Sequence, residues 1–314
     1  MDFRKIIFIV GPTAVGKSDV ACRIASCIPC EIISCDSMQI YREITIANNK
    51  PGPQTLREFP HHLVDILSIT EEFDVARFDE LAQAAIRDVQ SRGKVPLVVG
   101  GSGMYMQVLL DGIFKGGIKN ENLRKDLKEQ ARQHGNQYIY DKLIAVDPVA
   151  AGKIHPNDVR RVVRALEIAM TEQVPISEMQ KNRQGLWGHF DISLFALNRE
   201  RAELYRRIDA RVDEMFRQGL VDEIGALKNM AWSLTAGKII GVPEVQKILR
   251  SECTVDEAKE AMALNTRRLA KRQLTWFRKD KRLEWIDIAP GVETALAAER
   301  IMHIYQSAIG ATGR

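Results

Sequence analysis

A glycine-rich stretch near the N-terminus carries the clearest chemical signal in the sequence. An apolar run leads into Gly11. Four residues separate Gly11 from Gly16-Lys17-Ser18, so the stretch fits the pattern G-x-x-x-x-G-K-[ST]. Glycines let backbone N–H groups turn around an anion, while the lysine adds a full positive charge and the serine supplies an oxygen for Mg²⁺. The pattern therefore predicts a nucleotide- or diphosphate-binding loop, a P-loop, made of Gly11, Pro12, Thr13, Ala14, Val15, Gly16, Lys17 and Ser18.

The loop alone leaves its ligand open. It could hold the terminal phosphates of ATP, or an organic diphosphate whose carbon group moves while the diphosphate departs. A P-loop ATPase usually has a second strand that ends in a metal-binding carboxylate, but the apolar run 95–99 ends in Gly-Gly-Ser-Gly. Asp36, after the run 31–35, is the one well-placed carboxylate. It could be a general base, a metal ligand or a helix cap.

The elements that position these residues follow an alternating pattern. Short apolar runs at 6–10, 31–35 and 95–99 flank helical patterns at about 17–26 and 75–92. Buried strands that alternate with helices predict a parallel sheet covered on both faces. Ligands then bind beyond the carboxyl ends of the strands, where the P-loop, Asp36 and Ser102 all fall.

The character of the chain changes after Phe114. Residues 115–188 are charged, helical in period and poor in β-branched residues, so we expect a mostly helical insertion domain there. Residues 1–114 and 189–314 would form the P-loop NTPase-like α/β core. In its second half we expect strands at 189–197 and 282–288 and helices at 202–230, at 256–279 and from about 293.

Composition excludes several classes of protein. The 314 residues are 45% hydrophobic with a net charge of +4, and no apolar run approaches the length of a membrane span. We therefore expect a cytoplasmic protein without membrane contact. Five cysteines are an odd number for a disulfide framework, and Cys27-x-x-Cys30 lacks the partners of a zinc site. His61 and His62 would point to opposite faces of a strand, so we predict no metal there.

Several motifs together resemble one family, the tRNA dimethylallyltransferases, also called tRNA isopentenyltransferases. The resemblance covers residue 9 to about residue 278 and includes specific blocks of the types D-S-x-Q-x-Y, G-G-[ST]-x-x-Y and A-K-R-Q-x-T-W-F. It implies that a dimethylallyl group moves from dimethylallyl diphosphate to N6 of adenine 37, in the anticodon stem-loop of a tRNA. The P-loop would then hold the donor's diphosphate with Mg²⁺ at Ser18, and no phosphoryl group would be transferred.

The resemblance also assigns roles to individual residues. Asp36 is implied as the base that takes a proton from the adenine amine, whose lone pair is delocalised into the ring. Ser102, where the family more often has Thr, is implied to hydrogen-bond that amine. Arg211 is implied to hold the leaving diphosphate, although by composition it could be one of several solvated helix arginines.

An adenine inside an anticodon loop must be extruded to react, so the enzyme needs a surface that grips RNA. Arg268, Lys271 and Arg272 share a helical face, and we expect Trp276 in the core beneath it. The complete set predicted to contact tRNA is Asp36, Ser37, Met38, Gln39, Ser102, Arg124, Arg160, Arg161, Arg164, Arg268, Lys271 and Arg272.

The chain departs from the family pattern in two places. Ile240-Gly241-Val242-Pro243-Glu244 stands where I-G-Y-[KR]-[EQ] is common, and Ala47-Asn48-Asn49 stands where G-T-A is common. These changes spare the residues assigned to the reaction. Two other functions stay open: a small-molecule kinase that uses ATP, and a non-catalytic RNA-binding protein with a degenerate P-loop. We expect a monomer.

Overall fold

A parallel sheet forms the centre of the protein. The computed structural model describes residues 5–114 and 120–312, with side chains described as far as residue 307, so the predicted start of the insertion at residue 115 lies outside the described residues. Within the described residues, the six strands follow the order β3-β2-β4-β1-β5-β6, and every pair of neighbouring strands is parallel. They are β1 (Lys5–Val10), β2 (Cys30–Ser34), β3 (His61–His62), β4 (Val95–Gly100), β5 (Asp191–Arg199) and β6 (Glu284–Ile288).

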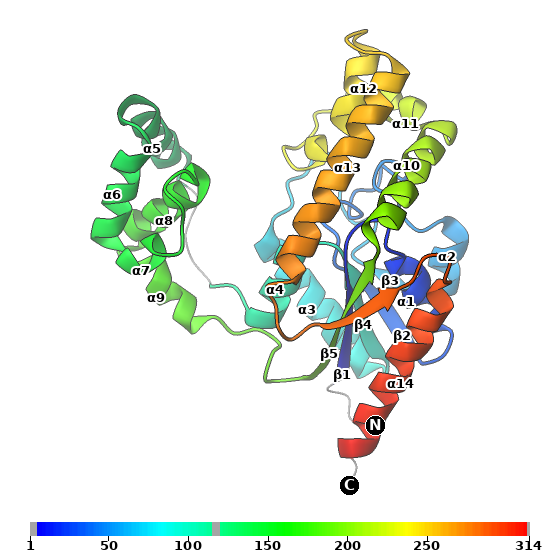
Figure 1. The fold of residues 1–314 in the computed structure, drawn as a ribbon. Coiled ribbons are helices and arrows are strands. Elements are labelled where there is room, and N and C mark those ends of the chain that lie inside the picture. The colour runs from blue at the N-terminus through cyan, green and yellow to red at the C-terminus, as the bar shows by residue number, and fades with distance from the viewer. Residues whose placement is uncertain (1–4, 115–119, 313–314) are drawn as a thin grey trace. The chain divides into compact units, whose positions relative to one another are not determined.

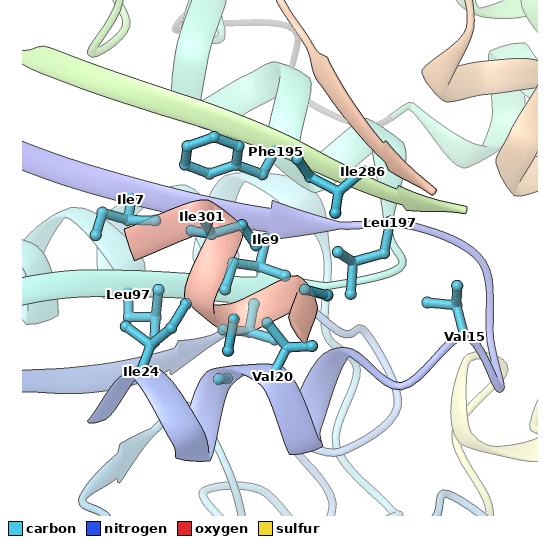
Figure 2. Close-up of a cluster of buried hydrophobic side chains, with 14 of the residues drawn as sticks. Ile7, Ile9, Val15, Val20, Ile24, Leu97, Phe195, Leu197, Ile286 and Ile301 are labelled. Carbon is cyan, nitrogen blue, oxygen red and sulfur yellow. The ribbon is translucent and has the colours of Figure 1, made fainter. Parts of the chain in front are cut away.

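Helices α1 (Lys17–Ala25) and α14 (Thr294–Thr312) contact each other and build one core with the sheet. Figure 2 shows Ile7 and Ile9 of β1 pointing toward Ile24 of α1 and Ile301 of α14, and all four side chains are fully buried. The alternate residues of β1 are also fully buried. Successive strand side chains point to opposite faces, so both faces of this strand are covered, as the unbroken apolar run predicted.

The remaining helices of the part of the chain that contains the sheet are labelled in Figure 1. They are α2 (Pro53–Glu58), α3 (Val75–Ser91), α4 (Gly103–Asp111), α10 (Arg201–Arg217), α11 (Leu220–Ala226), α12 (Val242–Leu249) and α13 (Val255–Phe277), with a 3₁₀ turn at Ala236–Lys238. The helix predicted over 202–230 is two helices, because Gly219 has a φ of 93°, in the left-handed region that ends a helix.

Residues Leu110–Leu186 form a separate compact unit, and residues Met1–Leu109 with Trp187–Arg314 form the other. The smaller unit contains α5 (Glu121–His134), α6 (Asn136–Val146), α7 (Pro148–Ala151), α8 (Val159–Glu172), α9 (Ile176–Met179) and a 3₁₀ turn at Gln180–Asn182. Leu127, Ile139, Leu143 and Leu166 are part of its own hydrophobic core. The prediction for this region was a mostly helical insertion over residues 115–188.

The smaller unit begins and ends at the same place. A Cβ added to Gly112 would lie 2.4 Å from the backbone of Gln184, and one added to Gly185 would lie 2.2 Å from the carbonyl oxygen of Leu110. The two connecting segments are therefore in backbone contact, and only glycine allows this approach.

No helix in the described part of the chain is long and apolar enough to span a membrane.

Candidate functional site

Three neighbouring strands deliver the predicted residues to one edge of the sheet. β2, β4 and β1 are consecutive in the sheet, and Asp36, Ser102 and the P-loop follow their carboxyl ends. Left-handed backbone at Ala14 (φ 64°) and Gly16 (φ 106°) turns the P-loop into the first turn of α1. The structure thus brings the predicted donor and acceptor residues together.

Lys17 folds back onto its own loop. Its Nζ donates hydrogen bonds to the carbonyl oxygens of Gly11, at 3.0 Å, and Pro12, at 2.8 Å. Burial and, to a smaller extent, the charge of Arg211 lower the pKa of Lys17 to about 8, although Asp36 opposes the shift. Removing the ammonium group from water favours its neutral form, so this lysine gains from a bound anion that stabilises its charge.

Three arginines also contact the P-loop. The Nε atoms of Arg207 and Arg199 donate to the carbonyl oxygens of Ala14, at 2.8 Å, and Val15, at 3.0 Å. Nη1 of Arg211 donates to Oγ1 of Thr13 at 3.3 Å. Burial, followed by the charge of Arg207, lowers the pKa of Arg211. These contacts add positive charge around the loop and hold its carbonyl groups away from the anion site.

The acceptor side rests on hydrogen bonds between the ends of β2 and β4. Oδ1 of Asp36 accepts from the backbone N–H of Met38 at 2.9 Å, and Oγ of Ser102 accepts from the N–H of Ser37 at 3.2 Å. The N–H of Ser102 donates to the carbonyl oxygen of Cys35 at 3.2 Å. No helix begins between Cys35 and Gly52, so the contact of Asp36 is a turn contact and not a helix cap, and it engages one oxygen of the carboxylate.

Glycines make this close pairing of the strand ends possible. A Cβ on Gly100 would lie 1.9 Å from the carbonyl oxygen of Cys35, a backbone atom that cannot move aside. Gly100 therefore serves backbone contact between strand ends.

The departure at Ala47-Asn48-Asn49 supports the block that begins at Asp36. Nδ2 of Asn48 donates to the carbonyl oxygen of Met38 at 3.0 Å, and Nε2 of Gln39 donates to that of Asn49 at 3.2 Å. The side chain that replaces the family's threonine thus contacts the acceptor-side loop directly.

The second departure, at Val242-Pro243, begins helix α12. Pro243 lies in the first helical turn, where no intrahelical N–H partner is needed. Val242 is fully buried, and Glu244 accepts from the N–H of Gly241 at 2.8 Å. The change from the family pattern is therefore compatible with a regular helix start.

Helix α13 lies against the loop that contains Ser102. Oε1 of Gln273 accepts from the N–H of Thr13 at 2.8 Å, and its Nε2 donates to the carbonyl oxygen of Gly101 at 3.0 Å. Trp276 lies three residues further along α13, and its ring packs on Gly103, where an added Cβ would lie 2.3 Å from it. Gln273 is the fixed glutamine of the A-K-R-Q-x-T-W-F block, but sequence reasoning gave it no role, because its partners lie 260 and 172 positions away in the chain.

The prediction that Trp276 lies in the core is wrong. Its side chain is 42% exposed, whereas its neighbour Phe277 is fully buried. Because adjacent residues on a helix point in directions about 100° apart, only one of the two can enter the core. Phe277 takes that position, and Trp276 packs on Gly103 instead.

The predicted basic face of α13 is present. Arg268, Lys271 and Arg272 are exposed, and no ion pair joins any of them to another described residue. Arg267 has a different task, because its Nη2 contacts Oδ1 of Asp209 on α10 at 2.5 Å. Three positive charges on α13 thus face solvent.

In the smaller unit two of the predicted arginines meet a buried acid. Nε of Arg124 and Nη1 of Arg164 donate to Glu167, at 2.8 and 2.6 Å, and Glu167 is fully buried. Burial opposes ionisation of Glu167, but hydrogen bonds from Arg164, the Asn120 N–H and Arg124 lower its pKa. Arg161 pairs with Asp158 at 2.5 Å, and Arg160 is exposed. Arg124 and Arg164 thus stabilise this unit as well.

The protein offers few ligands for a metal ion. Among the described residues there is no group of three or more His, Cys, Asp or Glu side chains that could hold one. His62 instead contacts Glu31 at 2.7 Å. The hydroxyl of Ser18 lies exposed in the first turn of α1, and the site also has the carboxylate of Asp36. These hard oxygen atoms fit a Mg²⁺ ion that takes most of its other ligands from water and diphosphate.

The chain is similar in sequence to proteins of one family. Residues 39–280 match the family model for IPP transferase. The chain is 41% identical to a tRNA dimethylallyltransferase of Geobacter sulfurreducens over 285 residues, 90% of this chain and 92% of that protein. It is also 41% identical to the tRNA dimethylallyltransferase of Geobacillus thermodenitrificans, with 95% of each chain covered.

Solved structures resemble this fold over nearly its whole length. The full-length tRNA isopentenylpyrophosphate transferase of Bacillus halodurans has a TM-score of 0.71 and 36% identity, over 98% of this chain and 96% of that one. A eukaryotic dimethylallyltransferase solved acting on tRNA has a TM-score of 0.82 and 30% identity, over 98% of this chain and 80% of that one. The predicted α/β fold class is confirmed by the parallel sheet and by these neighbours.

Proposed function

The chain belongs to the IPP transferase family, and on that premise we propose that it moves a dimethylallyl group from dimethylallyl diphosphate to N6 of adenine 37 in a tRNA. Prenyl transfer to tRNA is its reaction. The products are N6-dimethylallyladenosine and diphosphate. Because a hydrocarbon group is transferred and not a phosphoryl group, the diphosphate that the P-loop holds is the leaving group. The observation that supports this most is the meeting of a cationic P-loop with Asp36 and Ser102 at one sheet edge.

On the donor side, the P-loop binds the diphosphate of the substrate. Backbone N–H groups from Ala14 to Ser18 face the phosphate oxygens, aided by the positive end of α1. When the diphosphate binds, the Lys17 ammonium donates its hydrogen bonds to phosphate oxygens in place of the carbonyl oxygens of Gly11 and Pro12. With Arg211 it stabilises the charge that develops as the bond between the allylic carbon and the diphosphate oxygen breaks.

On the acceptor side, the extruded adenine places its amine between Ser102 and Asp36. The Ser102 hydroxyl orients the amine, and the Asp36 carboxylate accepts its proton while the nitrogen bonds to the allylic carbon. The charge of Asp36 raises the pKa of Lys17, against the larger effect of burial, and this supports a base close to the donor cradle. Base and leaving group therefore serve the same substitution.

We propose Mg²⁺ as the cofactor, held by the Ser18 hydroxyl together with the diphosphate. When bound, it neutralises part of the diphosphate charge. The exposed hydroxyl of Ser18 and the small number of acidic ligands in the site support an ion that arrives with its substrate.

The partner is the anticodon stem-loop of the tRNA. We propose that the exposed face of Arg268, Lys271 and Arg272 contacts its backbone, together with Arg160 and its neighbours in the smaller unit. We propose that the protein acts as a monomer. We place the enzyme in the cytoplasm, with its tRNA substrates.

The deciding experiment offers the protein two donors. An anticodon stem-loop with adenines at positions 36, 37 and 38 is incubated with Mg²⁺ and labelled dimethylallyl diphosphate, or with ATP labelled at its terminal phosphate. We expect label on the RNA from the isoprenoid donor alone. Consumption of ATP without use of the isoprenoid would favour the kinase alternative, and RNA binding without either reaction would favour a binding protein.

Asp36→Ala tests the proposed base. Without the carboxylate the amine keeps its proton, so we expect turnover to fall by roughly 10²–10⁴-fold. Filter binding should show tRNA affinity within about twofold of the wild type, because RNA phosphate contacts dominate affinity. Near-normal turnover of this variant would remove Asp36 from the chemistry.

A further inference from the structure

One side chain connects the donor cradle to the acceptor loop. The amide of Gln273 on α13 has both ends engaged: its oxygen accepts from the N–H of Thr13 in the P-loop at 2.8 Å, and its nitrogen donates to the carbonyl oxygen of Gly101 at 3.0 Å. Gly101 directly precedes Ser102. We propose that Gln273 is a positioning residue that holds the two half-sites of the proposed prenyl transfer at their working separation.

The contacts around the amide leave it little freedom. A Cβ on Gly101 would lie 2.4 Å from Nε2 of Gln273, so the glutamine packs directly on the backbone of the loop. Thr13 is also held from α10, where Nη1 of Arg211 contacts its hydroxyl at 3.3 Å. One P-loop residue is thus restrained by two helices, one through its N–H and one through its side chain.

The bond to Thr13 engages one N–H of the P-loop and leaves the other N–H groups of the loop for the diphosphate. Gln273 therefore fixes where the P-loop lies, and it is not itself part of the anion-binding groups. The same helix carries the exposed cations Lys271 and Arg272, directly beside Gln273. The helix proposed to grip the RNA is therefore the one that sets the spacing of the reacting groups.

A small loss of alignment between reacting groups lowers the rate more than the affinity. A misplacement of about 1 Å can cost on the order of 10²-fold in rate. Gln273 touches neither the diphosphate-binding Lys17 nor the exposed cationic face, so its removal should leave both binding steps intact.

Two variants separate hydrogen bonding from packing. Gln273→Met keeps the length of the side chain and loses both hydrogen bonds. Gln273→Glu keeps the shape and the acceptor for Thr13, but it turns the donor to Gly101 into a second acceptor. We expect kcat to fall by about 10–100-fold in both. In Gln273→Met, which is uncharged, KM for the anticodon stem-loop and Kd for inorganic diphosphate should stay within about threefold of the wild type, whereas the negative charge of Gln273→Glu should also weaken diphosphate binding.

Thr275→Ala is the matched control. Thr275 is exposed on the same helix, and its hydroxyl donates to the carbonyl oxygen of Lys271 at 2.9 Å. This variant should turn over like the wild type. Diphosphate titration counts the folded fraction of every variant, so a loss of folded protein is not mistaken for a loss of rate.

The outcomes discriminate. A wild-type kcat in Gln273→Glu would mean that the side chain only fills space, and it would overturn the proposal. So would a loss that lies wholly in KM or Kd, because Gln273 would then be a binding residue. The inference rests on the proposed function; if the wild-type protein itself transfers no prenyl group in this assay, that function fails first.

Discussion

At the scale of single residues, the P-loop is organised by the cations around it. Lys17 bonds two carbonyl groups of its own loop, and Arg207 and Arg199 bond two more. The two carbonyl groups that the arginines hold belong to Ala14 and Val15, and the N–H groups that follow them, of Val15 and Gly16, are left to face the anion. The loop is therefore shaped for a diphosphate before one arrives, and this reduces the entropy lost on binding.

The lowered pKa of Lys17 predicts a pH-dependent affinity for diphosphate. The free protein loses the Lys17 proton as pH rises through about 8, whereas the bound diphosphate favours the charged form. Affinity should be steady up to about pH 7.5 and should fall by about tenfold between pH 7 and pH 9. Calorimetric titration with inorganic diphosphate at several pH values measures this.

Lys17→Met is the comparison for this experiment. Its affinity should be lower at pH 7 and nearly constant up to pH 9. The same decline in both proteins would show that another group titrates.

Arg207 and Arg206 give a matched pair at this scale. Arg207 donates to the carbonyl oxygen of Ala14, whereas Arg206 is exposed and pairs with Glu203. Arg207→Gln should weaken diphosphate binding by about tenfold, because a hydrogen bond from a charged group contributes on the order of 1.5 kcal/mol. Arg206→Gln has the same charge change and should bind nearly as well as the wild type. An equal loss of diphosphate affinity in both variants would show that net charge alone causes the effect.

At the scale of elements, α13 combines three tasks. Its Phe277 is buried, its Gln273 and Trp276 lie against the loop around Ser102, and its basic residues face solvent. The ion pair between Arg267 and Asp209, at 2.5 Å, attaches it to α10. Binding at the exposed face of α13 can thus affect the loop around Ser102 through a single helix.

Neutralising the exposed face should weaken RNA binding in a salt-dependent way. The double variant Lys271→Gln, Arg272→Gln loses two cations and should bind the stem-loop less tightly at low salt. The slope of log K against log salt should become shallower by about 1–2. Filter binding between 50 and 300 mM salt measures it.

The control removes the same charge elsewhere. Arg217 and Arg250 are exposed, and each pairs with a nearby glutamate. Arg217→Gln with Arg250→Gln should leave the slope unchanged. If both double variants have the wild-type slope, α13 is not part of the RNA surface.

At the scale of the whole molecule, the chain leaves and re-enters the core unit at one place. Backbone contact between the segments at Gly112 and Gln184 keeps the two ends together, and each unit has its own hydrophobic core. An insertion of this kind adds a surface without breaking the sheet that holds the site.

Excision of the smaller unit tests this independence. A variant in which a short Gly-Ser linker replaces residues 113–184 should fold and bind inorganic diphosphate within about twofold of the wild type, because the whole P-loop lies outside the deleted segment. Its affinity for the stem-loop should fall by about tenfold or more. Circular dichroism and calorimetry measure the first expectation, and filter binding measures the second. Unchanged RNA affinity would show that the unit does not contact RNA.

Local spacing determined much about this protein. The P-loop, the alternation of strand and helix, the parallel sheet and the change of character after Phe114 can all be read from neighbouring residues, because helical and strand periods and turn glycines are local properties. The strand order was not predicted. It follows from packing, and it is what brings Asp36, Ser102 and Lys17 to one edge.

Only the tertiary structure revealed how the site is held. The bonds from Arg199, Arg207 and Gln273 to the P-loop join residues 184, 193 and 260 positions apart, and no periodic pattern encodes such a distance. The exposure of Trp276 was decided in the same way, by which of two adjacent aromatic side chains the core could accept. The sequence by itself thus determined what chemistry the chain carries, and folding determined which distant side chains align it, since packing and long-range hydrogen bonds exist only once the chain has closed on itself.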